Sequence, residues 1–288
     1  MPTSFKKLRN LDYLDLKGNQ LVELPLWFPQ LQRLTELHLG DNPLKELPAE
    51  WLEPRNLRWL DLNNTQLRGL PIWFVQLQNL ATLKLEGNQL KELPKQFGYL
   101  QNLNILDIRN NQLKELPASF KRLKKLRYLY LGNNQLKELP VWFGQLQQLR
   151  YLGVNNNQLK ELPASFWQLQ KLKELWLNEN QLKELPKSFG QLQKLEELRL
   201  ENNQLKELPA SFWQLENLQK AYIDSNEISK LPKEMLDLNL EIFWKDGYIR
   251  EGITIANNPL TSPPPEVIQQ GQQAIFDYFE QLESQAIN

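Results

Sequence analysis

The chain has 288 residues, and its 34 lysines and arginines balance its 34 aspartates and glutamates, so no net charge draws it to nucleic acid or to an anionic membrane. It contains no cysteine, which excludes disulfides, thiol nucleophiles and thiolate metal sites and fits a reducing compartment. The first residues form no apolar signal segment, and no run approaches the roughly 18 apolar residues that a membrane span requires. We therefore expect a cytoplasmic protein with no nucleic-acid or membrane partner.

The chain begins in the middle of a repeated unit. Residues 1–5 overlay residues 116–120 of a later unit, and Leu8 and Leu11 take the places of Leu123 and Leu126. Solenoids usually close their ends with polar caps, so two explanations are open. We favour excision from a longer chain over a first unit that tolerates an exposed edge.

A sequence motif, complete at residues 129–140, then repeats every 23 residues. Each copy contains an asparagine, which we use to mark the position of the repeat. Thr65 fills one marker position, and Asn258 follows Asn226 by 32 rather than 23 residues. A fixed period in the twenties indicates a solenoid, and we expect about 11 repeats in one elongated domain over residues 1–262. The marker asparagines are Asn19, Asn42, Asn88, Asn111, Asn134, Asn157, Asn180, Asn203, Asn226 and Asn258.

Each unit predicts a short strand followed by an irregular return segment. Leu129 and Leu131 flank Tyr130, which is the alternation of a half-buried strand, so stacked copies predict a parallel sheet. Pro140 follows and excludes a central strand, so the chain should turn into a 3₁₀-like return. One aromatic position per unit predicts a buried spine. Its members are Phe28, Trp51, Phe74, Phe97, Phe120, Phe143, Phe166, Phe189 and Phe212.

The marker asparagine has a structural role, because its amide can both donate hydrogen bonds to and accept them from the backbone of adjacent turns. Thr65 cannot make all of these bonds. Each net hydrogen bond lost costs on the order of 1 kcal/mol, so we expect a weak point at this unit.

The 23-residue spacing is interrupted after Asn226, and the additional residues lie within residues 238–250. A turn at Asp246-Gly247 predicts a small hairpin-like protrusion. Beyond it, residues 263–288 predict a capping helix from about Glu266 to Glu283. Its apolar stripe would be Ile268, Ile275, Phe279 and Leu282.

The unit Leu-x-x-Leu-x-Leu-x-x-Asn-x-Leu-x-x-Leu-Pro-x-x-Phe-x-x-Leu-x-x resembles the 23-residue form of the leucine-rich repeat family over residues 1 to 262. The resemblance implies an α/β fold: a right-handed curved solenoid with a concave parallel sheet and a convex side of irregular or 3₁₀ segments. It also implies a concave face that binds another macromolecule, here a protein or peptide.

The ending at residues 258–279, with Asn258-Pro259-Leu260 and then Pro263-Pro264-Pro265, is similar to the end of the repeat arm in bacterial Roco proteins. In those proteins a Ras-like GTPase domain follows. The resemblance implies the regulatory or partner-binding arm of a larger signalling protein, with an attached or neighbouring GTPase domain as partner. The chain has no Gly-x-x-x-x-Gly-Lys-Ser/Thr loop, so GTP chemistry is not assigned to it.

The outward strand positions predict two columns on the concave face. The first column is Tyr13, Glu36, Trp59, Thr82, Ile105, Tyr128, Tyr151, Glu174, Glu197 and Lys220. The second column is Asp15, His38, Asp61, Lys84, Asp107, Tyr130, Gly153, Trp176, Arg199 and Tyr222. Aromatic residues cluster in the middle with charged residues beside them, as in binding hot spots, although Tyr and Trp also suit exposed strands that bind nothing. The predicted protein-binding residues are Trp59, Ile105, Asp107, Arg109, Tyr128, Tyr130, Tyr151, Glu174, Trp176, Arg199 and Tyr222.

Two alternative functions belong to other classes of protein. Asp15, His38 and Asp61 occupy successive rungs of the second column around the only histidine and would be the site of a hydrolase or metal-binding protein. No nucleophile accompanies them on an open wall, so we expect no enzyme, no metal and no cofactor. The other alternative is a stand-alone repeat protein, either secreted for host interaction or a consensus-designed binder.

Self-association is the last possibility, as a weak homodimer through convex tryptophans. We expect these side chains to be partly buried instead. They are Trp27, Trp73, Trp142, Trp167 and Trp213.

Overall fold

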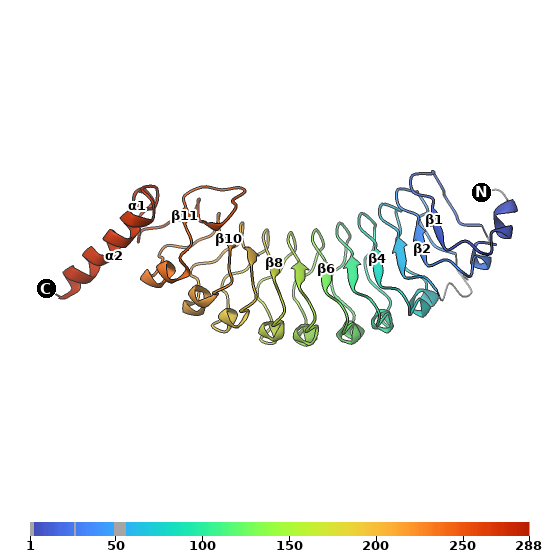
Figure 1. Cartoon of the computed structure of the whole chain (residues 1–288), viewed down its shortest axis with the longest axis horizontal. Helices are drawn as coiled ribbons and strands as arrows, with labels where there is room; N and C mark the ends of the chain where they lie inside the picture. Colours follow the sequence, from blue (N-terminus) through green and yellow to red (C-terminus); the bar gives the residue numbers. More distant parts are fainter. Residues whose placement is uncertain (1–2, 26, 49–55, 288) are drawn as a thin grey trace.

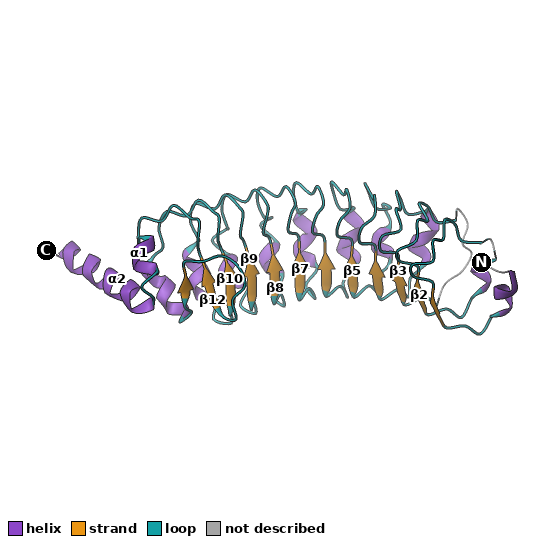
Figure 2. Cartoon of the chain, turned by 90° about the horizontal axis from the view of Figure 1, so that it is seen from above, coloured by secondary structure: helices purple, strands orange, loops and turns teal. Residues whose placement is uncertain are grey.

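The computed structural model describes residues 3–25, 27–48 and 56–287. Trp51 of the predicted aromatic spine lies outside these residues. The described chain forms a shallow arc with the 3₁₀ helices on its outer side (Figure 1). Seen at right angles, the strands stand side by side in one row and helix α2 projects at one end (Figure 2).

The strands form one 12-stranded parallel sheet in the order β1-β2-β3-β4-β5-β6-β7-β8-β9-β10-β12-β11. Each repeat contributes a short strand whose middle residue is buried, because the Leu-x-Leu alternation turns that side chain toward the core. The strands are β1 Tyr13–Asp15, β2 Glu36–His38, β3 Trp59–Asp61, β4 Thr82–Lys84, β5 Ile105–Asp107, β6 Tyr128–Tyr130, β7 Tyr151–Gly153, β8 Glu174–Trp176, β9 Glu197–Arg199, β10 Lys220–Tyr222, β11 Ile242–Phe243 and β12 Gly252–Thr254. The predicted solenoid with a parallel sheet is confirmed.

The return segments are 3₁₀ helices, five of which begin directly after the proline of the Leu-Pro step. They are η1 Thr3–Lys7, η2 Phe28–Gln30, η3 Ile72–Gln76, η4 Phe97–Tyr99, η5 Ala118–Arg122, η6 Val141–Gln145, η7 Phe166–Gln168, η8 Phe189–Gln191, η9 Ala210–Gln214 and η10 Lys233–Leu238. Every described member of the phenylalanine spine is fully buried in the core. Phe143 and Phe166, for example, stack with their ring centroids 6.3 Å apart.

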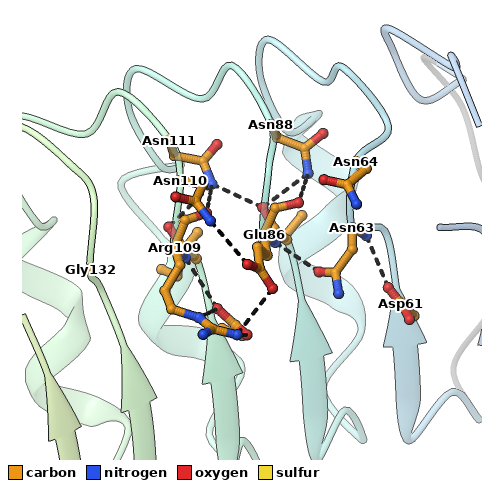
Figure 3. Close-up of polar contacts among 12 residues, drawn as sticks. Asp61, Asn63, Asn64, Glu86, Asn88, Arg109, Asn110, Asn111 and Gly132 are labelled. Carbon is orange, nitrogen blue, oxygen red and sulfur yellow. Dashed lines mark hydrogen bonds and ion pairs between the residues drawn. The ribbon is translucent and has the colours of Figure 1, made fainter. Parts of the chain in front are cut away.

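The side chains of the marker asparagines form hydrogen bonds with the backbone groups of the turns between units. The Asn134 amide nitrogen donates to the carbonyls of Ile108 and Leu131, at 3.0 Å each, and its oxygen accepts the backbone N–H of Leu113 at 3.0 Å. Asn88 and Asn111 make the same pattern of bonds (Figure 3). Each amide thereby connects its own unit to the preceding one, which stabilises the stack.

Thr65 makes fewer of these bonds, as expected from its side chain. Its hydroxyl donates to the carbonyl of Leu62 at 2.7 Å. The N–H of Leu44, which in a regular unit would donate to the next marker amide, instead bonds to the carbonyl of Asn42 at 2.8 Å.

The 3₁₀ helices pack in pairs that the 23-residue period does not predict. A Cβ atom built on Gly98, Gly144 or Gly190 would lie 1.8, 2.0 or 2.1 Å from the serine carbonyl oxygen of the following unit. These carbonyls belong to Ser119, Ser165 and Ser211. Glycine therefore recurs in every second unit because the next helix approaches its Cα closely.

The insertion after η10 is not a hairpin, so that prediction is wrong. Strand β12 lies between β10 and β11, and β11 pairs with it in parallel. The chain must therefore cross back between β11 and β12, whereas a hairpin joins antiparallel strands. Gly247 lies in this crossover segment, residues 244–251, with φ of 88°.

The predicted capping helix is present but divided into α1 Pro265–Ile268 and α2 Gln272–Ile287. Gly271, with φ of 92°, separates them. Ile268, Ile275 and Phe279 are buried as predicted, but Leu282 is 41% exposed because α2 continues beyond the end of the sheet (Figure 2). Within the described residues, no helix has the length and apolar character needed to cross a membrane.

The convex tryptophans pack against the core, as expected. Trp73 and Trp213 are buried, whereas Trp27, Trp142 and Trp167 are partly buried. Self-association stays an untested alternative.

Candidate functional site

Strand register assembles the two predicted columns. Ile105 is paired with Tyr128, Tyr128 with Tyr151 and Tyr151 with Glu174 in the first column. The second column is aligned in the same way, with Gly153 between Tyr130 and Trp176. The parallel sheet thus brings most of the predicted residues onto one surface.

At the centre of this surface, the ring of Tyr151 crosses from the first column to the second. A Cβ atom on Gly153 would lie 3.0 Å from the Tyr151 hydroxyl oxygen and 3.2 Å from a ring carbon. The ring occupies the space left by the missing side chain and is 8% exposed. Its centroid lies 4.5 Å from that of Tyr130 and 5.4 Å from that of Trp176, the latter edge to face.

Arginines flank this stack at both ends. The Arg109 guanidinium lies 5.2 Å from the Tyr130 ring centroid. The Arg199 guanidinium lies 4.6 Å from the ring centroids of both Trp176 and Tyr222. Cation–π attraction holds such groups over aromatic faces, and we call Arg109, Tyr130, Tyr151, Trp176 and Arg199 the aromatic ladder.

Acidic side chains fix both arginines. Arg109 donates to Asp107 at 2.7 Å and to Glu86 at 3.0 Å (Figure 3), and its hydrogen bond to Asp107 is the main cause that raises the pKa of Arg109. Arg199 bonds to Glu197 at 3.0 Å, and Lys220 contacts the same carboxylate at 3.4 Å. These networks hold the guanidinium planes in place, and a fixed guanidinium stacks on an aromatic face at a lower entropic cost.

The remaining predicted residues differ in exposure. Trp59, Ile105, Tyr128, Glu174 and Trp176 are half-buried and present part of their side chains. The indole N–H groups of Trp59 and Trp176 have no hydrogen-bond partner in the described part of the chain. Buried N–H groups usually find a partner, so these two are exceptions, and both N–H groups are shielded from solvent by the surrounding side chains.

Tyr222 is a correction, because the sequence places it on the open face and the structure covers it. It is 3% exposed, and its hydroxyl lies 3.4 Å from the backbone carbonyl of Ile249 in the crossover segment. The crossover therefore forms a wall at this end of the concave face. The sequence shows an insertion but not which column it covers.

In the column of Asp15, His38 and Asp61, the histidine lies closer to Glu36 of its own strand than to Asp61. His38 bonds through Nε2 to Glu36 at 2.8 Å, and its Nδ1 lies 3.9 Å from Asp61. Asp15 and Asp61 each accept a backbone N–H two residues later in the chain, Asp61 at 2.9 Å (Figure 3). In the three described ranges, no three His, Asp or Glu side chains are grouped to hold a metal ion.

A further cavity, of about 560 Å³, lies between the crossover and the ends of β9 and β10. Glu201 and Asp224 line it, and one carboxylate oxygen of Glu201 is buried with no partner among the described residues. Burial raises the pKa of Glu201 to about 7 and also raises that of Asp224. These residues belong to a third column, directly after the second core position of each strand, from which the sequence prediction included only Arg109.

Comparison with known families accounts for the repeated unit. The sequence matches "Leucine rich repeat" over residues 1–44, 32–90, 93–136 and 170–228, and "Leucine-rich repeat region" over residues 120–181. The chain belongs to the leucine-rich repeat family. Domains of this family are generally protein-binding modules without catalytic activity. A comparison with curated protein sequences finds no match.

Solved leucine-rich repeat structures share the fold. A leucine-rich repeat protein of Leptospira interrogans is 31% identical with a TM-score of 0.52, and the match covers 92% of this chain and 82% of that one. The ectodomain of the Arabidopsis thaliana receptor kinase GASSHO1/SCHENGEN3, solved in complex with CASPARIAN STRIP INTEGRITY FACTOR 2, is 28% identical with a TM-score of 0.65. That match covers 84% of this chain but only 32% of the receptor. An internalin of Listeria monocytogenes, at 22% identity and a TM-score of 0.69 over 87% of this chain and 69% of that one, shows the same fold.

Proposed function

We propose that this protein is a non-catalytic binding module that holds an extended peptide or protein segment on its concave face, centred on the aromatic ladder. The observation that carries the proposal is the packing of Tyr130, Tyr151 and Trp176 between fixed arginines. Rigid aromatic groups beside charged side chains are typical of binding hot spots.

The family and its solved relatives support a protein or peptide as the partner class. The GASSHO1/SCHENGEN3 ectodomain is a leucine-rich repeat domain in complex with a named factor. Cytoplasmic location is part of this proposal, which rests on the absence of cysteine in a chain of 288 residues.

The test uses a random twelve-residue peptide library displayed on phage as the probe. We expect the wild-type chain to select peptides whose binding is lost when Tyr130 and Trp176 are both changed to alanine. The control is Ile72→Ala with Val141→Ala, because these convex side chains are 77% and 80% exposed and far from the ladder. Peptides that bind the ladder variant as tightly as the wild type would contradict the proposal, provided that its circular dichroism shows an intact fold.

We propose, more specifically, that the module is the partner-binding arm of a Roco-type signalling protein. The support is the ending at residues 258–279, whose Asn-Pro-Leu and triple-proline steps resemble that arm. The reading frame beyond Asn288 tests this placement. A Ras-like GTPase domain encoded there supports it, and an unrelated domain or a stop codon contradicts it.

A further inference from the structure

Two carboxylate–aromatic pairs on the concave face each hold a guanidinium, and a third pair lacks one. Arg109 bonds to Asp107 and lies over Tyr130. Arg199 bonds to Glu197 and lies over Trp176. The same two kinds of group occur at Glu174, which is paired with Tyr151 in the strand register, but among the described residues no arginine forms an ion pair with it.

Glu174 stands apart from the other acidic residues of the two columns. Asp15, Glu36, Asp61, Asp107 and Glu197 each make a hydrogen bond or ion pair. In the described part of the chain, the carboxylate of Glu174 makes none, although it is half-buried. Burial and the nearby Glu197 and Glu196 raise the pKa of Glu174, and the more distant charges of Lys220 and Arg199 only partly offset this effect.

The surroundings of Glu174 have the geometry to accept a planar cation. Tyr151 points its ring toward Gly153, so it lies low between its first-column neighbours. Tyr128 stands two strands from Glu174, a separation of about 10 Å at ordinary strand spacing. A guanidinium placed above Tyr151 would therefore lie about 5 Å from both the Tyr128 column position and the Glu174 column position.

We infer that Glu174, Tyr128 and Tyr151 form a subsite for an arginine side chain of the bound peptide. The partner supplies the third guanidinium, bonding in a fork to the Glu174 carboxylate and stacking against the half-buried ring of Tyr128, above the nearly buried ring of Tyr151. This inference rests on the proposed function, because it places one residue of the peptide that the ladder binds. Arginine is favoured over lysine because an ammonium cannot stack in this way.

The peptide selection described above tests the subsite. Peptides selected by the wild-type chain are expected to share an arginine at one fixed position. Glu174→Gln, which keeps the shape and removes the charge, should raise their Kd about tenfold, as loss of a charge-assisted hydrogen bond does. Replacing the peptide arginine by lysine should weaken binding to the wild type by several-fold and to Glu174→Gln by less.

Two further variants sharpen the result. Glu138→Gln is the matched control, because Glu138 is exposed and lies outside the strand columns, so binding should not change. Glu174→Arg should instead select peptides with aspartate or glutamate at the same position.

The outcomes separate the two hypotheses. Ladder-dependent peptides without a shared arginine, and bound equally by Glu174→Gln, overturn the subsite and leave the proposed function standing. Recovery of no peptide, or of peptides indifferent to Tyr130 and Trp176, overturns the proposed function and the subsite with it.

Discussion

The ring of Tyr151 lies in the space where a side chain of Gly153 would be, with its hydroxyl oxygen 3.0 Å from the position of a Cβ atom. Two residues apart on one strand, they normally point the same way and occupy different columns. The glycine lets the tyrosine lie flat against the sheet, and this joins Tyr130 and Trp176 into one stack.

Gly153→Val should displace the Tyr151 ring and break the stack. The backbone of Gly153 is not in the left-handed region, so the strand tolerates the change, and the cost is crowding of about 1–2 kcal/mol in the free energy of unfolding. Near-ultraviolet circular dichroism should lose the signal of coupled aromatic rings, and denaturant unfolding should give the energy. Unchanged spectra would show that the ring does not depend on the glycine.

Gly144→Ala should destabilise the convex side. The new methyl group would lie 2.0 Å from the carbonyl oxygen of Ser165, a backbone atom held by η7, so the two helices must move apart. We expect a loss of about 1–3 kcal/mol in the free energy of unfolding, measured by urea denaturation. Gly69→Ala is the matched control, because a Cβ atom there meets nothing within 4 Å. Equal effects of the two changes would show that the pairing of η6 with η7 contributes nothing.

The sequence was sufficient for the features that repeat in every unit. Once Leu129 and Leu131 are placed inside, the 23-residue period fixes which side chains line each column, because identical units must stack in one register. The roles of Asn134 and Phe143 follow for the same reason, since each has a copy directly above and below it.

Features that break the period could not be read in the same way. The orientation of the Tyr151 ring toward Gly153 depends on the close approach of the two residues, which the repeat pattern does not predict. The crossover at residues 244–251 covers Tyr222 because β12 enters the sheet before β11, and a turn signal at Gly247 cannot distinguish this from a hairpin. The helix pairs did have a signal, because Gly98, Gly144 and Gly190 recur every second unit.

Thr65→Asn should stabilise the protein. The new amide oxygen would accept the N–H of Leu44, which now bonds to the carbonyl of Asn42, and the new amide nitrogen would give the carbonyl of Leu39 a second donor. We expect a gain of about 1 kcal/mol in the free energy of unfolding. Slower hydrogen exchange of the Leu44 amide would place the gain at this unit. The reverse change, Asn134→Thr, should lower stability, and a neutral result for both would contradict the role given to the marker amide.

Glu201 should make stability fall as pH rises from about 4.5 to 7. Burial raises its pKa from 4.5 to about 7 in the folded protein, so the folded state binds a proton that the unfolded state has released. The contribution of Glu201 to the free energy of unfolding is complete below the pKa of the unfolded state, and it is lost as the pH rises through the pKa of the folded state. Glu201→Gln should therefore exceed the wild type by about 1–2 kcal/mol at pH 8, after allowance for solvent screening of this partly exposed group, and match it near pH 4.5.

Urea unfolding of both proteins at pH 4.5, 6 and 8 measures this difference. The other titrating groups are common to the two chains. The difference between their free energies of unfolding therefore reports on Glu201, together with any change in the pKa of its neighbours. Asp224 lines the same cavity and raises the pKa of Glu201, whereas Arg199, with a guanidinium nitrogen 3.9 Å from the carboxylate, lowers it. The exposed Glu138→Gln variant should show no such divergence. A constant difference between Glu201→Gln and the wild type across this range would mean that the carboxylate is ionised throughout and that Arg199 outweighs burial.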